Sequence, residues 1–191
     1  MSPTQPPTQP PTQAPTQPSP TATGRLTRRT GIPLLEFERT FRAPIDDVWD
    51  AVTEPERLER WIGTWTGDPA TGRVTFRMTA EGDDVPDETI WVDVCERPTR
   101  LVMRSMPPGE DAPWRWELTL AESDGVTTLT FAQEVTGAEL ALSVGPGWDY
   151  YLDRLVAAET GADVSAVDFA DYEPALSEHY RRELRDGGLE V

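Results

Sequence analysis

Apolar and polar residues alternate along six short stretches of the chain, with the period of two that is typical of strands with one buried face. The stretches are residues 35–41, 74–78, 90–95, 101–106, 114–120 and 126–135. The last four follow one another across short connections, and Ser123, Asp124 and Gly125 carry a tight-turn signal. We therefore expect an antiparallel meander whose apolar face is covered by another element.

A period close to 3.6 replaces this alternation after the first strand. Apolar residues there recur at i, i+3, i+4 and i+7, which puts them on one face of a helix. The positions of this face are Ile45, Val48, Trp49 and Val52. Thr53 is the expected N-cap of a second short helix over residues 54–61, because Glu56 stands three residues on, as in a capping box.

The stretch GPGWDYYLDRL predicts the helix that covers the sheet. Gly145 is the expected N-cap and Pro146 the first helical residue, where the fixed φ of proline is favourable. Gly147, which has no side chain, is expected to let the helix and the sheet approach closely. The apolar stripe then runs to Gly161, and its members are Trp148, Tyr151, Leu152, Leu155 and Val156. A last helix is expected over residues 174–185.

The first thirty residues consist mainly of proline, threonine and glutamine, with the triplet Pro-Thr-Gln recurring. Such a stretch has little apolar surface to bury, so we expect a disordered, solvated tail over residues 1–30 in preference to a proline-rich docking ligand. Deleting it is then expected to leave the melting temperature unchanged. The expected domain spans residues 31–161, and residues 162–191 form an acidic C-terminal extension with a short helix.

The charge balance is strongly acidic, since 34 Asp and Glu residues stand against 17 basic ones, a formal net charge of −17. Nucleic-acid affinity comes largely from basic side chains that neutralise phosphates, so we expect no nucleic-acid partner. No apolar run approaches the ~20 residues of a membrane-spanning helix, and we expect no membrane insertion. The single Cys95 excludes an intramolecular disulfide. Together with the lack of a signal-peptide pattern, this predicts a cytoplasmic protein.

No catalytic or metal-binding motif is complete. Ser143 and Gly145 resemble the serine elbow of α/β-hydrolases, with His179 downstream, but that elbow needs a parallel sheet. One cysteine and one histidine are too few for a usual zinc site. The acidic turn over residues 83–88 lacks the ligand order of a calcium loop. No lysine follows the glycines at 145 and 147, as a phosphate-binding loop requires. We therefore expect no cofactor and no metal.

One block near the start of the domain is similar to a known family. The motif FERTFRAPIDDVWDAVTEPERLERWIG contains, in order, Arg39, Ala43-Pro44, Val48-Trp49, Glu54-Pro55-Glu56 and Arg60-Trp61. This order resembles the activator-of-heat-shock-protein-90-ATPase homologue family, a branch of the START-like or SRPBCC superfamily. The turn before Leu101 and the spacing of Trp148, Leu152 and Leu155 also match, so the resemblance covers residues 34–161. One departure is the sparse glycine at residues 67–72, where relatives carry a Gly-Gly turn.

The resemblance implies an α+β helix-grip fold: a curved antiparallel sheet wrapped around a long C-terminal helix, with two short helices after the first strand. It also implies a cavity between helix and sheet that takes an apolar or amphipathic small molecule. Members of the superfamily include binding proteins, cyclase-like enzymes and chaperone activators, so membership alone does not decide function.

Arg39 is expected on the inward face of its strand, where a guanidinium needs a carboxylate or a polar ligand. An internal ion pair or an exit of the side chain at the strand end is favoured over a ligand-orienting role, and these alternatives stay open. Most tryptophans are expected in the core, and a subset with neighbouring Phe, Met and Tyr side chains is expected to line a pocket. The expected ligand-binding residues are Arg39, Trp61, Phe76, Met78, Met103, Trp116, Trp148 and Tyr151.

The sequence therefore predicts a binder of a small hydrophobic or amphipathic molecule, in preference to an enzyme. A second hypothesis is a protein-interaction or chaperone-activator role, exerted through the acidic face and the terminal helices. A third is a cyclase- or hydratase-type enzyme that uses the pocket and one or two polar groups.

Overall fold

An eight-stranded antiparallel sheet organises the computed structural model, which describes residues 20–82, 84–109 and 112–189. The strands lie in the order β1-β2-β8-β7-β6-β5-β4-β3. Their bounds are β1 Arg25–Arg29, β2 Ile32–Phe41, β3 Thr64–Thr66, β4 Arg73–Arg77, β5 Glu88–Glu96, β6 Arg100–Ser105, β7 Trp114–Ser123 and β8 Val126–Glu134. The six predicted strands are all present, and the short edge strands β1 and β3 were not predicted.

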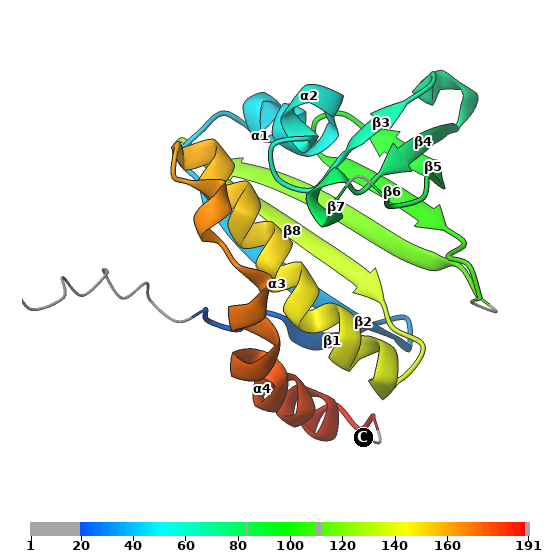
Figure 1. Cartoon of the computed structure of the whole chain (residues 1–191), viewed down its shortest axis with the longest axis vertical. Helices are drawn as coiled ribbons and strands as arrows, with labels where there is room; N and C mark the ends of the chain where they lie inside the picture. The colour runs from blue at the N-terminus through cyan, green and yellow to red at the C-terminus, as the bar shows by residue number, and fades with distance from the viewer. Residues whose placement is uncertain (1–19, 83, 110–111, 190–191) are drawn as a thin grey trace, which may run out of the picture.

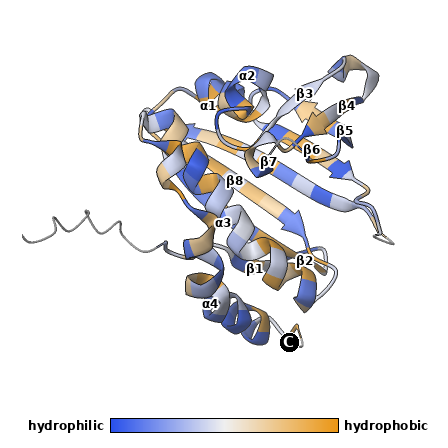
Figure 2. Ribbon diagram, viewed as in Figure 1, coloured by the Kyte–Doolittle hydropathy of each residue, from blue (hydrophilic) through white to orange (hydrophobic). Residues whose placement is uncertain are grey.

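Helices lie against one face of this sheet (Figure 1). Their bounds are α1 Ile45–Thr53, α2 Pro55–Leu58, α3 Ala138–Thr160 and α4 Tyr172–Asp186, with short 3-10 turns η1 Pro69–Thr71, η2 Thr79–Glu81, η3 Val164–Ala166 and η4 Phe169–Asp171. In Figure 2, hydrophobic and hydrophilic bands alternate along α3 and α4, as expected of helices with one buried face. The curved sheet, the long helix and the short helices after β2 confirm the α+β helix-grip fold.

The two short helices differ in detail from their prediction. α1 buries Val48, Trp49 and Val52, which confirms its expected apolar face. α2 is a single turn that begins at Pro55, and its N-cap is Glu54, without a side-chain capping bond. Thr53 is not the N-cap, because its hydroxyl donates to the carbonyl of Trp49 inside α1.

The long helix begins eight residues before the point that the sequence predicts. α3 starts at Ala138, so Pro146 lies inside the helix and not at its first position. The apolar stripe extends upstream through Ala141 and Val144, both buried, and their packing favours a helix in spite of the proline. The C-terminal end at Gly161 is as predicted, with a left-handed φ of 74°.

Of the two glycines in this stretch, Gly145 allows a neighbouring element, α4, to approach α3 closely, and Gly147 does not. A Cβ built on Gly145 would lie 2.7 Å from ring carbons of Tyr180, whose side chain is fully buried. A Cβ on Gly147 would meet nothing within 4 Å. The expectation that Gly147 brings helix and sheet together is therefore wrong, and Gly145 is the residue that admits a neighbouring ring.

The end of the predicted tail belongs to the sheet, while residues 1–19 lie outside the described part of the chain. β1 pairs with β2 along its whole length, with Leu26 opposite Leu35. The Leu26 N–H donates to Glu183 of α4 at 3.1 Å. The boundary predicted at residue 30 is thus wrong, because pairing with β2 and contact with α4 supply partners that the local sequence does not reveal.

The predicted C-terminal extension also packs onto the domain. α4 confirms the expected short helix, and it buries Leu176, Tyr180 and Leu184 against α3 and β1. Tyr180 and Leu184 have no exposed surface, as for residues at the centre of a core.

Deletion of residues 1–30 should lower the melting temperature by about 2–12 °C relative to deletion of residues 1–19. The longer deletion removes β1 and the hydrogen bonds that Thr23 makes to the buried Asp149. An unsatisfied buried group costs about 1–3 kcal/mol, and 1 kcal/mol corresponds to about 2–4 °C in a chain of this size. Calorimetry of the two truncated proteins measures the difference, and equal melting temperatures would show that β1 contributes no stability.

Gly145→Ala and Gly147→Ala should change stability in opposite directions. Alanine at 147 should raise the free energy of unfolding by about 0.5–1 kcal/mol, since it is the better helix former. Alanine at 145 should lower it by about 1–3 kcal/mol, because its Cβ overlaps the Tyr180 ring. Urea unfolding measures both variants, and an increase for Gly145→Ala would contradict the packing of Tyr180 against this glycine.

Candidate functional site

A row of directly paired residues crosses the sheet from β2 to β5. Gln133 in β8 lies opposite Leu35 in β2 and Trp116 in β7. Met103 in β6 lies opposite Trp116 and Val92. Leu35 is fully buried, and residues directly opposite one another share a face of the sheet. The row therefore belongs to the face on which α3 packs, which we call the inner face.

On strands β6, β7 and β8 of the inner face, four polar side-chain atoms are buried without a hydrogen-bond partner among the described residues. They are Ser105 Oγ in β6, Trp114 Nε1 and Trp116 Nε1 in β7, and Gln133 Nε2 in β8. Ser105 lies opposite Trp114, just as Gln133 lies opposite Trp116, so the four form one cluster on adjacent strands. We call it the inner polar patch. Each unsatisfied buried atom destabilises the fold by about 1–3 kcal/mol. A cluster of four therefore lowers the stability by more than is expected of a region that serves only to pack the core.

Trp148 of α3 fixes the orientation of the Gln133 amide. Its Nε1 donates to Gln133 Oε1. An indole nitrogen is only a donor, so the amide oxygen must face Trp148 and the amide nitrogen must face away from it. The Trp148 ring also packs on Phe131, with ring centroids 4.1 Å apart. The long helix and β8 together hold the free N–H groups of Gln133 in place.

Carboxylates lie at the β4–β5 side of the inner face. Glu88 lies opposite Phe76, and its Oε1 is buried without a partner among the described residues. Glu81 accepts a hydrogen bond of 2.7 Å from the Tyr151 hydroxyl. Burial, reinforced by the Glu81 carboxylate, raises the pKa of Tyr151 far above its ordinary value. Tyr151 is therefore a protonated donor at neutral pH, and its donor is already used by Glu81.

Six of the eight predicted ligand-binding residues lie on the part of the inner face around the inner polar patch or at its borders. Large apolar side chains there are only partly buried and pack against the core: Trp65, Phe76, Met78, Met103, Trp114, Trp116 and Trp148. Tyr151 is almost fully buried beside Trp148, with ring centroids 6.1 Å apart. Met103 thus lies opposite Trp116, and Trp148 lies beside Tyr151, while Phe76 and Met78 pack against the same core.

The other two predicted residues have different surroundings. Trp61 is buried, and its Nε1 donates to the carbonyl of Ala51 at 3.1 Å, so it is a hydrogen-bonded part of the core. Arg39 lies on β2 and faces α3, where its guanidinium contacts Asp149 at 3.1 Å and Asp153 at 2.8 Å. Of the alternatives left open for Arg39, the internal ion pair is the one that the structure contains.

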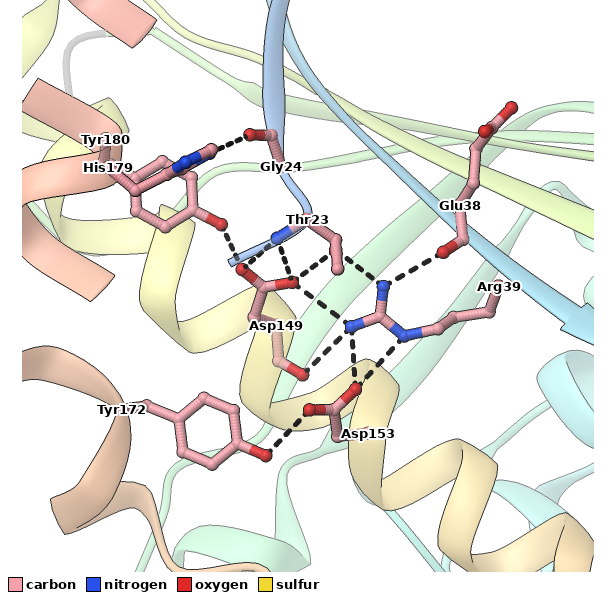
Figure 3. A network of polar contacts seen from close by, with 9 residues as sticks. All are labelled: Thr23, Gly24, Glu38, Arg39, Asp149, Asp153, Tyr172, His179 and Tyr180. Atoms are coloured by element: carbon pink, nitrogen blue, oxygen red, sulfur yellow. Dashed lines mark hydrogen bonds and ion pairs between the residues drawn. The ribbon is translucent and has the colours of Figure 1, made fainter. Parts of the chain in front are cut away.

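Figure 3 shows the network around Arg39. The guanidinium also donates to the Thr23 hydroxyl at 2.6 Å and to the Glu38 carbonyl at 3.0 Å. Its donors are thereby directed at protein acceptors. Asp149 and Asp153 each accept a further hydrogen bond from a tyrosine of α4, namely Tyr180 and Tyr172. The network joins the chain before β1 to β2, α3 and α4, which is a structural role.

Ser105, Trp114 and Gln133 are the members of the inner polar patch that are not among the predicted ligand-binding residues. A signal for two of them was present in the alternation of the strands. Gln133 stands two residues after Phe131, and Ser105 stands two residues after Met103, at positions where an apolar residue is expected. A polar residue at an inward position is informative, since it must be paired or serve a ligand.

A groove of about 860 Å³ lies on another side of α3, near the connection from α3 to α4. Its acidic lining residues are Glu38, Asp153, Asp163, Asp168 and Asp171. Asp163 and Asp168 accept backbone N–H groups at the starts of η3 and η4, and Asp153 is paired with Arg39. The fold itself accounts for most of these carboxylates.

The hydrolase motif is not assembled. Ser143 is exposed on α3, within a helix and not after a strand. The His179 Nε2 lies 2.7 Å from the carbonyl of Gly24. Within the described part of the chain, no three His, Cys, Asp or Glu side chains are grouped as metal ligands. None of the described helices is long and apolar enough to cross a membrane.

Several solved structures are similar to this chain. The crystal structure of CalU16 from Micromonospora echinospora is 25% identical with a TM-score of 0.70, over 85% of this chain and 98% of CalU16. DynU16, described as a protein in the dynemicin biosynthetic locus, is 28% identical with a TM-score of 0.58. That match covers 69% of this chain and about half of DynU16, 49%. The BPP1335 protein of Bordetella parapertussis shares the fold. It is 18% identical with a TM-score of 0.66, over 90% of this chain and 95% of its own.

No curated protein matches the chain. The sequence model of the family described as "Activator of Hsp90 ATPase homolog 1-like protein" matches residues 42–159, which is more than half of the chain. The matched region runs from the end of β2 almost to the end of α3, and so contains most of the inner face. The resemblance inferred from the sequence is confirmed: the chain belongs to the Activator of Hsp90 ATPase homolog 1-like family, within the SRPBCC fold.

Proposed function

We propose that this protein binds a small, mainly apolar molecule on the inner face, between strands β5–β8 and the helix α3. The observation that carries the proposal is the inner polar patch, because four buried polar atoms without partners are suited to a ligand that supplies them. Binding sites for small molecules are typically apolar, with a few polar groups that fix orientation. The partly exposed aromatic and methionine side chains around the patch match that description.

The accessible position of this face supports the proposal. In Figure 1, α3 runs beside β2 and β8, while β5, β6 and β7 lie to one side of it. The contacts of α3 with the sheet are mainly with β2, and its other large contact is with α4. Met103, Trp114 and Trp116, on strands that the helix does not cover, keep part of their apolar surface exposed. Exposed aromatic surface next to unpaired donors favours a binding site over a closed core.

The relatives support a small-molecule ligand without naming it. DynU16 is described as a protein of the dynemicin biosynthetic locus, which associates one relative with the production of a small molecule. The family description names activators of a chaperone ATPase. An activator role for this chain would leave the inner polar patch unexplained, so we rank protein interaction second. We also propose a cytoplasmic location, which the single cysteine supports.

Met103→Gln and Val102→Gln form a matched pair that tests the binding face. The two residues are neighbours in β6 on opposite faces, since Met103 pairs with Trp116 and Val102 with Glu117. We expect Met103→Gln to weaken binding of the neutral fluorescent probe N-phenyl-1-naphthylamine about tenfold, because an amide replaces apolar contact surface. Val102→Gln should leave the affinity unchanged.

Fluorescence titration measures the probe affinity, and native mass spectrometry of the purified full-length protein detects any molecule that it carries. Circular dichroism controls for folding of both variants. The proposal fails if the wild-type protein takes up no probe and carries no molecule. It also fails if both variants lower the affinity for the probe equally.

A further inference from the structure

We infer that the molecule bound on the inner face is neutral and presents hydrogen-bond acceptors, such as carbonyl oxygens, along one edge of an apolar body. The inference rests on the proposed function and narrows the ligand to a chemical class. Three observations carry it: the kind of polar atoms that are unpaired, their spacing on the sheet, and the signs of the charges nearby.

The unpaired atoms of the inner polar patch are mainly donors. Trp114 Nε1 and Trp116 Nε1 carry N–H groups that can only donate. The free nitrogen of Gln133 is also a donor, since the amide oxygen is taken by Trp148. The Ser105 hydroxyl can donate or accept. A ligand that offers only donors would satisfy Ser105 alone, whereas a ligand that offers acceptors can satisfy all four groups.

The donors are grouped over an area that matches a compact ring system. Residues directly opposite one another on antiparallel strands have Cβ atoms about 4.5–5.5 Å apart, and residues i and i+2 of a strand lie about 7 Å apart. The pairs Ser105–Trp114 and Gln133–Trp116 therefore form a four-cornered set. The two indole rings lie edge to face, with centroids 6.3 Å apart. Such a set fits one edge of a planar molecule of two or three fused rings.

The charges near the patch oppose an anionic ligand. The arginines of β6 and β7 belong to the outer face, where Arg104 lies opposite Arg115 and both pair with Asp93. Arg39 of β2 lies on the inner face, but its guanidinium is paired with Asp149 and Asp153. Arg154 of α3 is directed at the Tyr150 ring and the Trp61 carbonyl. Within the described residues, the Glu88 carboxylate on the inner face has a buried oxygen without a hydrogen-bond partner. An anionic ligand buried there would have no counter-charge, and the free energy of desolvating an unpaired charge is prohibitive. The acceptors of the ligand must therefore be neutral.

A matched series of fluorenes tests the inference on the full-length protein. Fluorene and 9-fluorenone share one tricyclic skeleton, and only the second carries a carbonyl. The carbonyl makes 9-fluorenone the less hydrophobic of the two, so a preference for it cannot come from the hydrophobic effect. We expect 9-fluorenone to bind about tenfold tighter than fluorene and tighter than the anionic 9-fluorenone-4-carboxylate. Displacement of N-phenyl-1-naphthylamine gives all three affinities.

Trp116→Phe should reduce the preference for 9-fluorenone over fluorene severalfold, because phenylalanine keeps an aromatic ring but lacks the N–H group. Trp114→Phe removes the neighbouring donor and provides a second test if Trp116→Phe does not fold. Trp91→Phe is the control, since Trp91 lies on the outer face, opposite Arg104 and beneath its guanidinium. It should keep the wild-type preference.

The outcomes separate the inference from the proposed function. Equal or tighter binding of fluorene shows that the donors are satisfied by water or remain unused, and overturns the inference while small-molecule binding stands. Tightest binding of the carboxylate overturns the neutral character of the ligand. If neither the fluorenes nor N-phenyl-1-naphthylamine binds, the proposed function fails together with the inference.

Discussion

The carboxylate of Asp149 on α3 is fully buried, and three separate segments of the chain meet there. It accepts the Thr23 N–H and hydroxyl before β1, the Arg39 guanidinium on β2 and the Tyr180 hydroxyl on α4. Burial, reinforced by this carboxylate, raises the pKa of Tyr180 far above its ordinary value, so the phenol keeps its proton and donates. A buried carboxylate is tolerated only when such donors surround it, so the positions of α3, β1 and α4 depend on one another.

This dependence relates the edge of the sheet to the proposed binding face. The helix α3 is held against β2 and α4 by Asp149 and Asp153, while Trp148, one residue before Asp149, reaches Gln133 and Phe131 on β8. Successive residues of one helical turn thus serve two different regions. The buried ion pairs fix the helix, and the fixed helix orients the Gln133 amide. We regard the Arg39 network as the support of the binding face and not as part of it.

The family match covers residues 42–159, and several partners of Asp149 lie outside that range. Thr23, Arg39 and Tyr180 precede or follow the matched residues, as do β1 and α4. The N-terminal strand and the C-terminal helix therefore add a second, polar attachment to the helix-grip core. Gly145 belongs to the same attachment, because it is the position in α3 against which the Tyr180 ring packs.

The sequence by itself determined the strands β2 and β4–β8 and the apolar face of α1, because periods of 2 and 3.6 are local properties of the chain. The helix-grip fold was implied by the resemblance of one sequence block to a known family. The sequence also indicated most aromatic members of the inner face and the possible roles of Arg39. Tertiary structure decided the rest. β1 forms because β2 and α4 supply its partners, and α3 extends past Pro146 because Ala141 and Val144 are buried in the core. Which polar atoms stay unpaired at Ser105, Trp114, Trp116 and Gln133 depends on contacts between strands and α3, and no local pattern contains those contacts.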